Sequence, residues 1–333
     1  MKALVLADID RRIEREFPQV TFEYKGYAVG NHIPIEHSEL KNIIQEYDFL
    51  ISEFDTIDKE IIDAATKLKM LICCRGGINS VVDVVYASRK GIIVRNTPAR
   101  NANAVAEYVL GIIINADRKL AKANTNVLDD TLQNQDFFLP KEYRDSLWGM
   151  DSKSPYHSFR GKGLSNITLG IIGYGNIGRT VANMANLLGI NVLVYNHHPI
   201  ISPVPAGIDV VDYDFLLKNS DYISLHCSNR EKKILISKSD FLKMKQGAYF
   251  INTARGNLVD EEALIEALEV EHLSGAALDV TTQEPLPPNS PLIKAKNIFL
   301  TPHIAGAADE VIQIGTDMVI YHLRNFLYDN WEA

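Results

Sequence analysis

The chain has few cysteines and no long hydrophobic run. Its three cysteines, Cys73, Cys74 and Cys227, have the spacing of neither a disulfide framework nor a metal site. Cys73 and Cys74 lie in an apolar run and indicate buried thiols in a reducing compartment, so we expect a cytoplasmic protein. No stretch reaches the about eighteen consecutive apolar residues of a membrane-spanning helix, and the apolar segment 3–7 is too short for a signal peptide.

An excess of positive charge is also absent. The net charge is −8, which argues against a nucleic-acid-binding surface. The hydrophobic fraction of 46% is ordinary for a globular protein, and a length of 333 residues favours two domains over one core. We therefore expect a small-molecule ligand, with neither nucleic acid nor a membrane as a partner.

Short apolar runs alternate with amphipathic stretches along most of the chain. We expect strands at 3–7, 48–52, 70–74, 92–95, 169–172, 192–195, 222–226, 248–251 and 275–279. Helices are expected at 38–46, 59–68, 81–90 and 104–123, whereas 126–166 shows no clear period. This alternation predicts parallel βαβ units, and hence an α/β protein with two doubly wound parallel-sheet domains.

A glycine-rich turn follows the expected strand 169–172. It consists of Gly173, Tyr174, Gly175, Asn176, Ile177 and Gly178, and a helix-compatible run continues to Leu188. Gly173 would allow the tight turn, Gly175 would let a pyrophosphate approach the backbone, and Gly178 would let the helix pack on the strand. The helix N-terminus would then face the phosphates. Strand, glycine turn and helix in this order predict a dinucleotide-binding site formed by these six residues.

The residue after the next strand departs from the usual pattern. Asn196 stands where an acid commonly binds the ribose 2′-hydroxyl, and His197 and His198 follow. An amide can still bind the hydroxyl, but it does not repel a 2′-phosphate. NAD is therefore the favoured cofactor, and NADP stays open. The two histidines indicate a solvated turn, and we expect no metal site because further ligands at suitable spacing are missing.

Three residues in the last third of the chain have the chemistry for oxidising a hydroxy acid. Arg255 follows the expected strand 248–251, and a guanidinium can hold a carboxylate with two parallel hydrogen bonds. His303 follows Pro302, and an imidazole can take the hydroxyl proton as hydride leaves the same carbon. Glu284 would accept the second ring N–H and fix the tautomer. We therefore predict Arg255, Glu284 and His303 as the catalytic residues.

The order of these motifs and their residue sequences resemble those of the D-isomer-specific 2-hydroxyacid dehydrogenase family, from about Leu71 to Ala308. The resemblance implies a Rossmann-type cofactor domain, residues 102–301, inserted in a flavodoxin-like substrate domain, residues 1–101 plus 302–333. The chain would cross between them near Asn101 and Pro302. Residues 126–166 match the arm that usually builds the dimer, so the resemblance also implies a homodimer.

The resemblance extends the predicted site in both domains. On the cofactor side it implies roles for Val105, His226, Thr253, Ala254 and Asp279. The acid matching Asp279 contacts the nicotinamide carboxamide in the family, whereas His226 would line the site without taking part in catalysis. On the substrate side, backbone N–H groups beside Gly76 and Gly77 would hold a carboxylate. Arg75 would bind a phosphate or carboxylate, or pair with a neighbour.

The implied activity is hydride transfer between a nicotinamide cofactor and C2 of a D-2-hydroxy or 2-keto acid. The sequences around Arg75 and Thr97 look most like those of the phosphoglycerate dehydrogenase-like branch, so the expected substrates include phosphorylated acids. Glu284 argues against formate, because formate-oxidising relatives carry Gln there. Two alternatives stay open: an NADPH-dependent glyoxylate or hydroxypyruvate-type reductase, and an NAD(H)-binding sensor or corepressor with little turnover.

Overall fold

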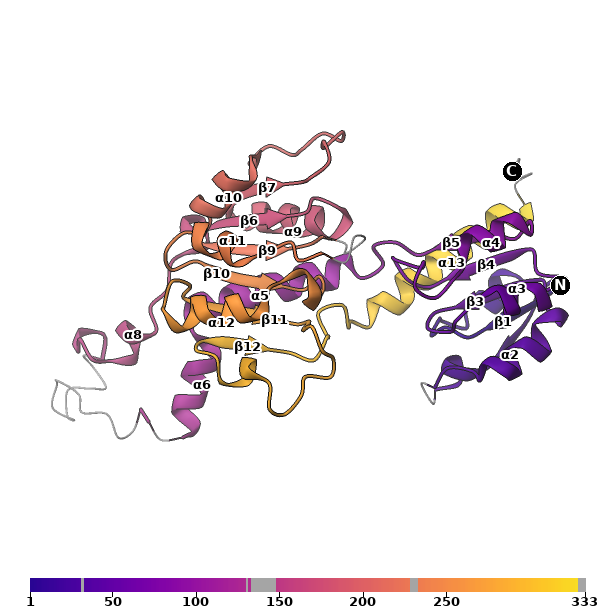
Figure 1. Ribbon diagram of the computed structural model, residues 1–333, viewed down its shortest axis with the longest axis horizontal. Coiled ribbons are helices and arrows are strands. Elements are labelled where there is room, and N and C mark those ends of the chain that lie inside the picture. The colour runs from indigo at the N-terminus through magenta and orange to yellow at the C-terminus, as the bar shows by residue number, and fades with distance from the viewer. Residues whose placement is uncertain (31–32, 130, 133–147, 228–232, 329–333) are drawn as a thin grey trace. The chain divides into compact units, whose positions relative to one another are not determined.

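The computed structural model describes residues 1–30, 33–129, 131–132, 148–227 and 233–328. The chain divides into two compact units (Figure 1). Unit 1 contains Met1–Asn101 and Ala307–Ala333, and unit 2 contains Ala102–Gly306. The chain thus changes unit between Asn101 and Ala102 and again between Gly306 and Ala307, and unit 2 is inserted in unit 1.

Unit 1 is built on a five-stranded parallel sheet with the order β2-β1-β3-β4-β5. The strands are β1 (Lys2–Val5), β2 (Thr21–Tyr24), β3 (Phe49–Ser52), β4 (Met70–Cys73) and β5 (Ile93–Asn96). The helices are α1 (Ile13–Glu16), α2 (His37–Ile43), α3 (Lys59–Ala64), α4 (Val84–Arg89) and α13 (Glu310–Tyr328), with 3-10 turns η1 (Gly26–Val29) and η2 (Ile44–Glu46). This strand order is that of flavodoxin-like folds, as the sequence predicted.

Both faces of this sheet are covered, which explains why its central strands are continuous apolar runs. Alternate residues of one strand enter different cores. Leu4 packs with residues of α2, α3 and α4, whereas Val5 packs with Val319 and Leu323 of α13. All four side chains are fully buried. The C-terminal helix is therefore a structural layer of unit 1, although more than two hundred residues separate it from β5.

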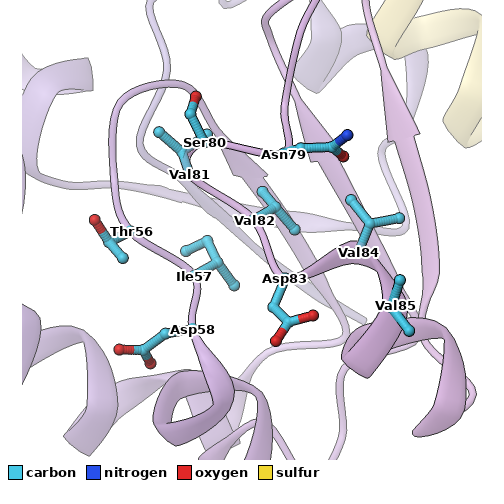
Figure 2. Close-up of a pocket in the computed structure, with 10 residues that line it drawn as sticks. All are labelled: Thr56, Ile57, Asp58, Asn79, Ser80, Val81, Val82, Asp83, Val84 and Val85. Carbon is cyan, nitrogen blue, oxygen red and sulfur yellow. The ribbon is translucent and has the colours of Figure 1, made fainter. Parts of the chain in front are cut away.

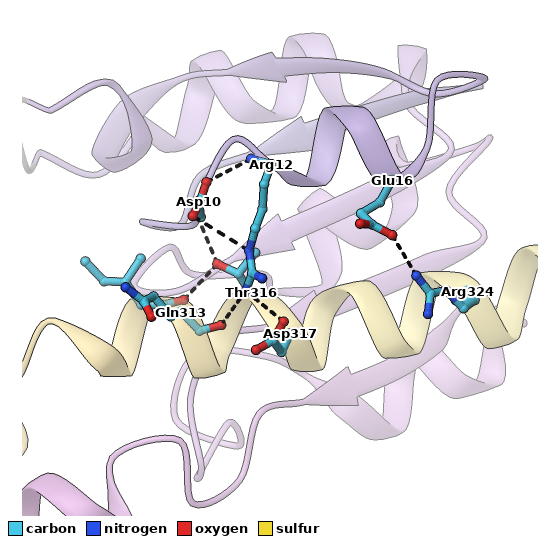
Figure 3. A network of polar contacts seen from close by, with 8 residues as sticks. Asp10, Arg12, Glu16, Gln313, Thr316, Asp317 and Arg324 are labelled. Atoms are coloured by element: carbon cyan, nitrogen blue, oxygen red, sulfur yellow. Dashed lines mark hydrogen bonds and ion pairs between the residues drawn. The ribbon is translucent and has the colours of Figure 1, made fainter.

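Polar contacts add to the attachment of α13 (Figure 3). The amide of Asp10 donates to Thr316 Oγ1 at 2.9 Å, and Arg12 pairs with Asp317 at 2.7 Å. Arg324 pairs with Glu16 on α1 at 2.6 Å. Exposed ion pairs contribute little to stability, so the buried apolar face of α13 dominates its docking.

Unit 2 is built on a seven-stranded parallel sheet with the order β12-β11-β10-β9-β6-β7-β8. The strands are β6 (Thr168–Ile172), β7 (Asn191–Tyr195), β8 (Ile208–Val210), β9 (Tyr222–Leu225), β10 (Tyr249–Asn252), β11 (Gly275–Leu278) and β12 (Ile298–Leu300). The helices are α5 (Ala102–Arg118), α6 (Leu120–Leu128), α8 (Pro155–Ser158), α9 (Asn176–Leu187), α10 (Tyr213–Asn219), α11 (Lys238–Lys243) and α12 (Glu261–Glu269). Strand order reverses between β6 and β9, as in Rossmann-type sheets. The predicted fold class is confirmed.

The structure corrects one helix and adds three strands. The helix expected at 104–123 is two helices, α5 and α6, because Lys119 between them has a left-handed backbone with φ of 51°. The strands β2, β8 and β12 were not predicted. Of the segment 126–166, for which a dimer arm was predicted, residues 130 and 133–147 lie outside the described residues.

The structure also bears on two expectations drawn from composition, those for buried thiols and for membrane-spanning helices. All three cysteines are free thiols, and Cys73 and Cys74 are fully buried, as predicted. Burial raises the pKa of the Cys73 thiol to about 11, so it is protonated and unreactive at neutral pH. Among the helices of the described residues, none combines the length and apolarity that crossing a membrane requires.

The docking of α13 leads to a first prediction. Leu323 is fully buried between the sheet and α13, so Leu323→Ala should lower the free energy of unfolding of unit 1 by about 2–5 kcal/mol. Urea unfolding with hydrogen exchange of β1 and β3 peptides measures this. The control is Val85→Ala on α4 of unit 1, at a side chain that is 62% exposed, where we expect a change below about 0.5 kcal/mol. Equal losses in the two variants would show that α13 is not part of this core.

Candidate active site

The glycine turn between β6 and α9 has little room for side chains at two of its three glycines. Gly173 has φ of 99°, and a Cβ there would lie 2.7 Å from the carbonyl oxygen of His226. A Cβ at Gly178 would lie 1.9 Å from the carbonyl oxygen of Gly173, so the helix packs directly on the turn. A Cβ at Gly175 would meet open space. This difference fits the predicted roles, because Gly175 leaves a surface that a phosphate could approach.

The start of α9 has the features of an anion site. The helix contains 12 residues, and its N-cap Gly175 supplies no side-chain hydrogen bond. The first amides of the helix therefore remain for a ligand, and the helix dipole favours negative charge there. Tyr174 is buried, and the guanidinium of Arg179 lies over its ring at 5.5 Å. The turn and helix end thus fit the pyrophosphate of a dinucleotide.

Asn196 follows β7, and its side chain binds the main chain of two different turns. Its side-chain oxygen accepts a hydrogen bond from the amide of Tyr174 at 3.0 Å, and its side-chain nitrogen donates to the carbonyl of His198 at 2.8 Å. Asn196 thereby links the glycine turn to the His197–His198 turn, whose two residues are exposed. An amide keeps one further lone pair and one further hydrogen. Binding of the ribose hydroxyl by Asn196 remains a prediction.

His226 follows β9, beside the glycine turn. Burial lowers the pKa of His226 to about 3, so the ring is neutral near physiological pH. Its Nε2 bonds Ser224 Oγ at 2.8 Å, and Ser224 is fully buried. His226 therefore contributes no charge to the cofactor side, and its non-catalytic role there stays a prediction.

Arg255 lies on the loop after β10 and is exposed. The loop is held by Asn252, which is 1% exposed: its side-chain oxygen accepts from the amide of Ala254, and its side-chain nitrogen donates to the carbonyl of Arg255, both at 2.9 Å. The Arg255 guanidinium donates to the carbonyl of Ala254 at 2.6 Å. Asn252 is a positioning residue that the sequence analysis missed, and its only signal was a polar residue ending an apolar strand.

His303 and Glu284 are in direct contact. His303 Nδ1 lies 2.9 Å from Glu284 Oε2, and the second carboxylate oxygen accepts from the amide of Thr281 at 3.2 Å. Both side chains are exposed, and Nδ1 is the ring nitrogen that contacts Glu284. The Nδ1 contact fixes the tautomer, because the carboxylate needs a donor there. The predicted pairing is therefore present in the geometry.

The loops carrying Arg255 and Glu284 pack against one another within unit 2. A Cβ at Gly256 would lie 1.9 Å from the carbonyl carbon of Thr281, so only glycine permits this approach. Gly256 follows Arg255 directly, and Thr281 bonds Glu284 through its amide. The structure thus brings the three predicted catalytic residues to loops after β10, β11 and β12 at one edge of the sheet. Their catalytic roles remain predictions.

The other predicted residues occupy several environments in unit 2. Val105 on α5 is 3% exposed and packs in the hydrophobic core. Ala254 is 8% exposed, and Thr253 is half-buried with a hydroxyl that has no partner among the described residues. Asp279 follows β11 and is 2% exposed. Their cofactor contacts stay predictions.

The predicted substrate-binding residues lie in unit 1, after β4. Arg75 stacks its guanidinium over the ring of Phe54 at 5.5 Å. The carbonyl of Gly76 accepts from Asn96 Nδ2 at 2.7 Å, which holds the loop in place. Gly76 and Gly77 are exposed, and a Cβ at either would meet open space. The backbone is therefore accessible at these two residues, and its binding of a carboxylate stays a prediction.

A separate hollow of about 460 Å³ lies on unit 1 between the loops before α3 and α4 (Figure 2). Its two acids already cap helices. Asp58 accepts from the amide of Ile61 and contacts His37, and Asp83 accepts from the amide of Tyr86. The side chains lining this hollow include no cation, so it lacks the chemistry for an anionic substrate.

Within the described residues, no group of histidine, cysteine and acidic side chains could hold a metal ion.

Comparison with known proteins identifies the family. Residues 110–305 match the model of the D-isomer specific 2-hydroxyacid dehydrogenase NAD-binding domain. The chain belongs to the D-isomer specific 2-hydroxyacid dehydrogenase family. It is therefore a member of a family of oxidoreductases whose cofactor is a nicotinamide dinucleotide, as the sequence predicted.

Three relatives illustrate the range of this family. A D-3-phosphoglycerate dehydrogenase of Archaeoglobus fulgidus is 34% identical over 300 residues, which are 89% of this chain but 52% of that protein. A glyoxylate reductase of Thermofilum pendens is 36% identical over 84% of this chain and 78% of its own. The solved structure of an acyclic imino acid reductase with NADPH and D-Arg is 27% identical, with a TM-score of 0.76, and the match covers 98% of this chain and 97% of that one. The chain thus spans about half the length of the phosphoglycerate dehydrogenase it matches.

The glycine turn leads to a second prediction. Gly178→Ala should destabilise unit 2 without cofactor by about 1–3 kcal/mol, because its methyl group has no space. Gly175→Ala should leave stability unchanged, since its φ of −80° suits alanine, but should weaken NADH binding about tenfold or more. Denaturant unfolding and fluorescence titration separate the two effects. Unchanged NADH affinity in Gly175→Ala would contradict a phosphate at this turn.

The half-buried imidazole of His226 leads to a third prediction. An unfolded histidine has a pKa near 6.5, whereas the pKa of folded His226 is about 3. The unfolded chain therefore binds more protons between these values, and the free energy of unfolding should fall by up to about 1.4 kcal/mol per pH unit as the pH drops below 6.5. His226→Gln should remove this slope. Urea unfolding of unit 2 at several pH values tests it, and identical pH dependence in both proteins would refute it.

Proposed function

We propose that the protein transfers hydride between a nicotinamide cofactor and C2 of a D-2-hydroxy or 2-keto acid. The observation that carries the proposal is the His303–Glu284 pair at 2.9 Å, in the same unit as the glycine turn that fits a dinucleotide. The relatives named as phosphoglycerate dehydrogenase and glyoxylate reductase support the substrate class.

The bound cofactor would accept or supply the hydride at C2. During oxidation, His303 would take the proton of the C2 hydroxyl on Nε2, while Glu284 holds the proton on Nδ1 and stabilises the resulting imidazolium. In the opposite direction the same ring would return a proton to the carbonyl oxygen. These roles follow from the tautomer that the Nδ1 contact with Glu284 fixes.

Arg255 would bind the substrate carboxylate and polarise the neighbouring carbonyl. Its guanidinium uses Nη1 for the carbonyl of Ala254, which leaves its other N–H groups available. A planar pair of N–H donors matches a carboxylate, whereas a lysine would supply only a point charge. In unit 1, the accessible backbone at Gly76 and Gly77 and the guanidinium of Arg75 would bind a carboxylate or a phosphate.

NAD is the cofactor we favour, and one observation favours an NADPH-dependent glyoxylate or hydroxypyruvate-type reductase as a second candidate. Asn196 places no negative charge at the end of β7, so a 2′-phosphate meets no carboxylate from this residue. A related imino acid reductase was solved with NADPH. Both cofactors therefore belong in any activity test.

We also propose that the protein is a cytoplasmic homodimer. Its three free thiols support a reducing compartment. The dimer rests on the family resemblance of residues 126–166 alone.

The decisive experiment is an assay with NADH and NADPH against a panel of 2-keto acids, including glyoxylate, hydroxypyruvate and 3-phosphohydroxypyruvate. We expect turnover on at least one of them. His303→Ala should lower kcat by roughly a hundredfold or more and leave NADH affinity intact, because the proton relay is lost while the cofactor site is retained. Arg89→Ala, on a surface helix of unit 1, serves as the control.

Tight NADH binding by the wild-type protein without turnover on any acid would favour the sensor or corepressor reading. Parallel losses of NADH affinity and rate in His303→Ala would remove His303 from proton transfer.

A further inference from the structure

Three successive backbone amides converge on one buried residue beside the predicted proton relay. The amide of His303 donates to the main-chain oxygen of Asp279, that of Ile304 to Asp279 Oδ1, and that of Ala305 to Asp279 Oδ2, each at 2.8 Å. Asp279 is 2% exposed. A buried carboxylate needs donors, and the loop 303–305 supplies them, so carboxylate and loop stabilise one another.

Two hydroxyl groups extend this contact to α5. Thr301 Oγ1 lies 2.7 Å from Asp279 Oδ1, and Tyr108 Oη lies 2.5 Å from Thr301 Oγ1. The carboxylate only accepts, so Thr301 donates its single hydrogen to Asp279, and Tyr108 must donate to Thr301. Burial raises the pKa of Tyr108, which keeps its hydroxyl protonated and able to donate. The order of donation is therefore Tyr108 to Thr301 to Asp279.

The chain of contacts ends at a strained backbone. His303 has φ of 57°, in the left-handed region, where a non-glycine residue costs about 1–2 kcal/mol. This conformation persists only if its surroundings impose it. The amides of 303–305 bound to Asp279 do so, and they set the direction in which the imidazole leaves the main chain toward Glu284.

We propose that Tyr108, Thr301 and Asp279 are positioning residues, which hold the loop 303–305 so that the His303 ring meets Glu284 in the geometry needed for proton transfer. The proposal rests on the function proposed above and adds three residues that act through His303. It gives Asp279 a role besides the contact with the nicotinamide carboxamide that the family resemblance implies. Both of its carboxylate oxygens already accept hydrogen bonds from the loop.

Positioning and cofactor binding predict different kinetics. A displaced imidazole slows proton transfer without changing how the cofactor binds, and a shift on the order of 1 Å can reduce the rate about a hundredfold. A lost contact to the cofactor would instead weaken NADH binding. The separation of kcat from NADH affinity therefore distinguishes the two roles of Asp279.

Thr301→Val tests the proposal, because it keeps the shape of the side chain and removes its hydroxyl. We expect kcat to fall about tenfold to a hundredfold, with the Kd for NADH and the KM for the keto acid within about twofold of wild type. Thr301→Ser should restore most of kcat, since it retains the donor. Tyr108→Phe should give a smaller loss, because Thr301 can still donate to Asp279. The exposed Thr66→Val is the matched control and should behave as wild type.

A second measurement is independent of activity. In Thr301→Val, amide exchange in a peptide covering 303–305 should accelerate about tenfold, whereas peptides of β10 should exchange as in wild type. Faster exchange in a protein without turnover would sink the proposed function and support the held loop. Unchanged exchange and kcat in Thr301→Val, or equal losses of kcat and NADH affinity, would overturn the positioning role.

Discussion

The hydrogen bond from the amide of Asp279 to the carbonyl of Asn252, at 3.0 Å, joins the ends of β10 and β11 and determines where the candidate site forms. Both residues are buried and polar, so their side chains must find partners. Asn252 finds them in the loop of Arg255, and Asp279 finds them in the loop of His303. The conformations of the two loops therefore follow from the sheet, and neither depends on loop propensity alone.

Much of this architecture could be predicted, because the central strands are buried on both faces. β4 and β11 have every residue buried, and such strands appear as continuous apolar runs in the sequence. The glycine turn was predictable for a related reason. Gly173 and Gly178 are positions where packing excludes any side chain, so the residue type itself records the close approach. Arg255 could be proposed because it follows the predicted strand 248–251, and Glu284 and His303 because of the sequences Glu284-Pro285 and Thr301-Pro302-His303. Their catalytic roles stay predictions.

The missed elements share a physical cause. β2, β8 and β12 each lie at an edge of a sheet and are three or four residues long, with partly exposed side chains. Edge strands need no continuous apolar run, so their sequences carry a weak signal. The break between α5 and α6 lies at the left-handed backbone of Lys119, and the residue type does not mark it because lysine favours helices. Similarly, the partners of Asp279 lie more than twenty residues away, and no local pattern specifies them.

Cofactor preference shows how a local sequence argument changes once the hydrogen bonds are known. If only charge is considered, Asn196 differs from an aspartate or glutamate in one respect: its neutral amide does not repel a 2′-phosphate. In the structure its side chain also donates to the carbonyl of His198 and accepts from the amide of Tyr174. An aspartate at this position could still accept from Tyr174, but it has no hydrogen to donate to His198. The residue that sets the charge near the ribose therefore also sets the shape of the turn after β7, and the two effects on cofactor choice cannot be varied independently at this position.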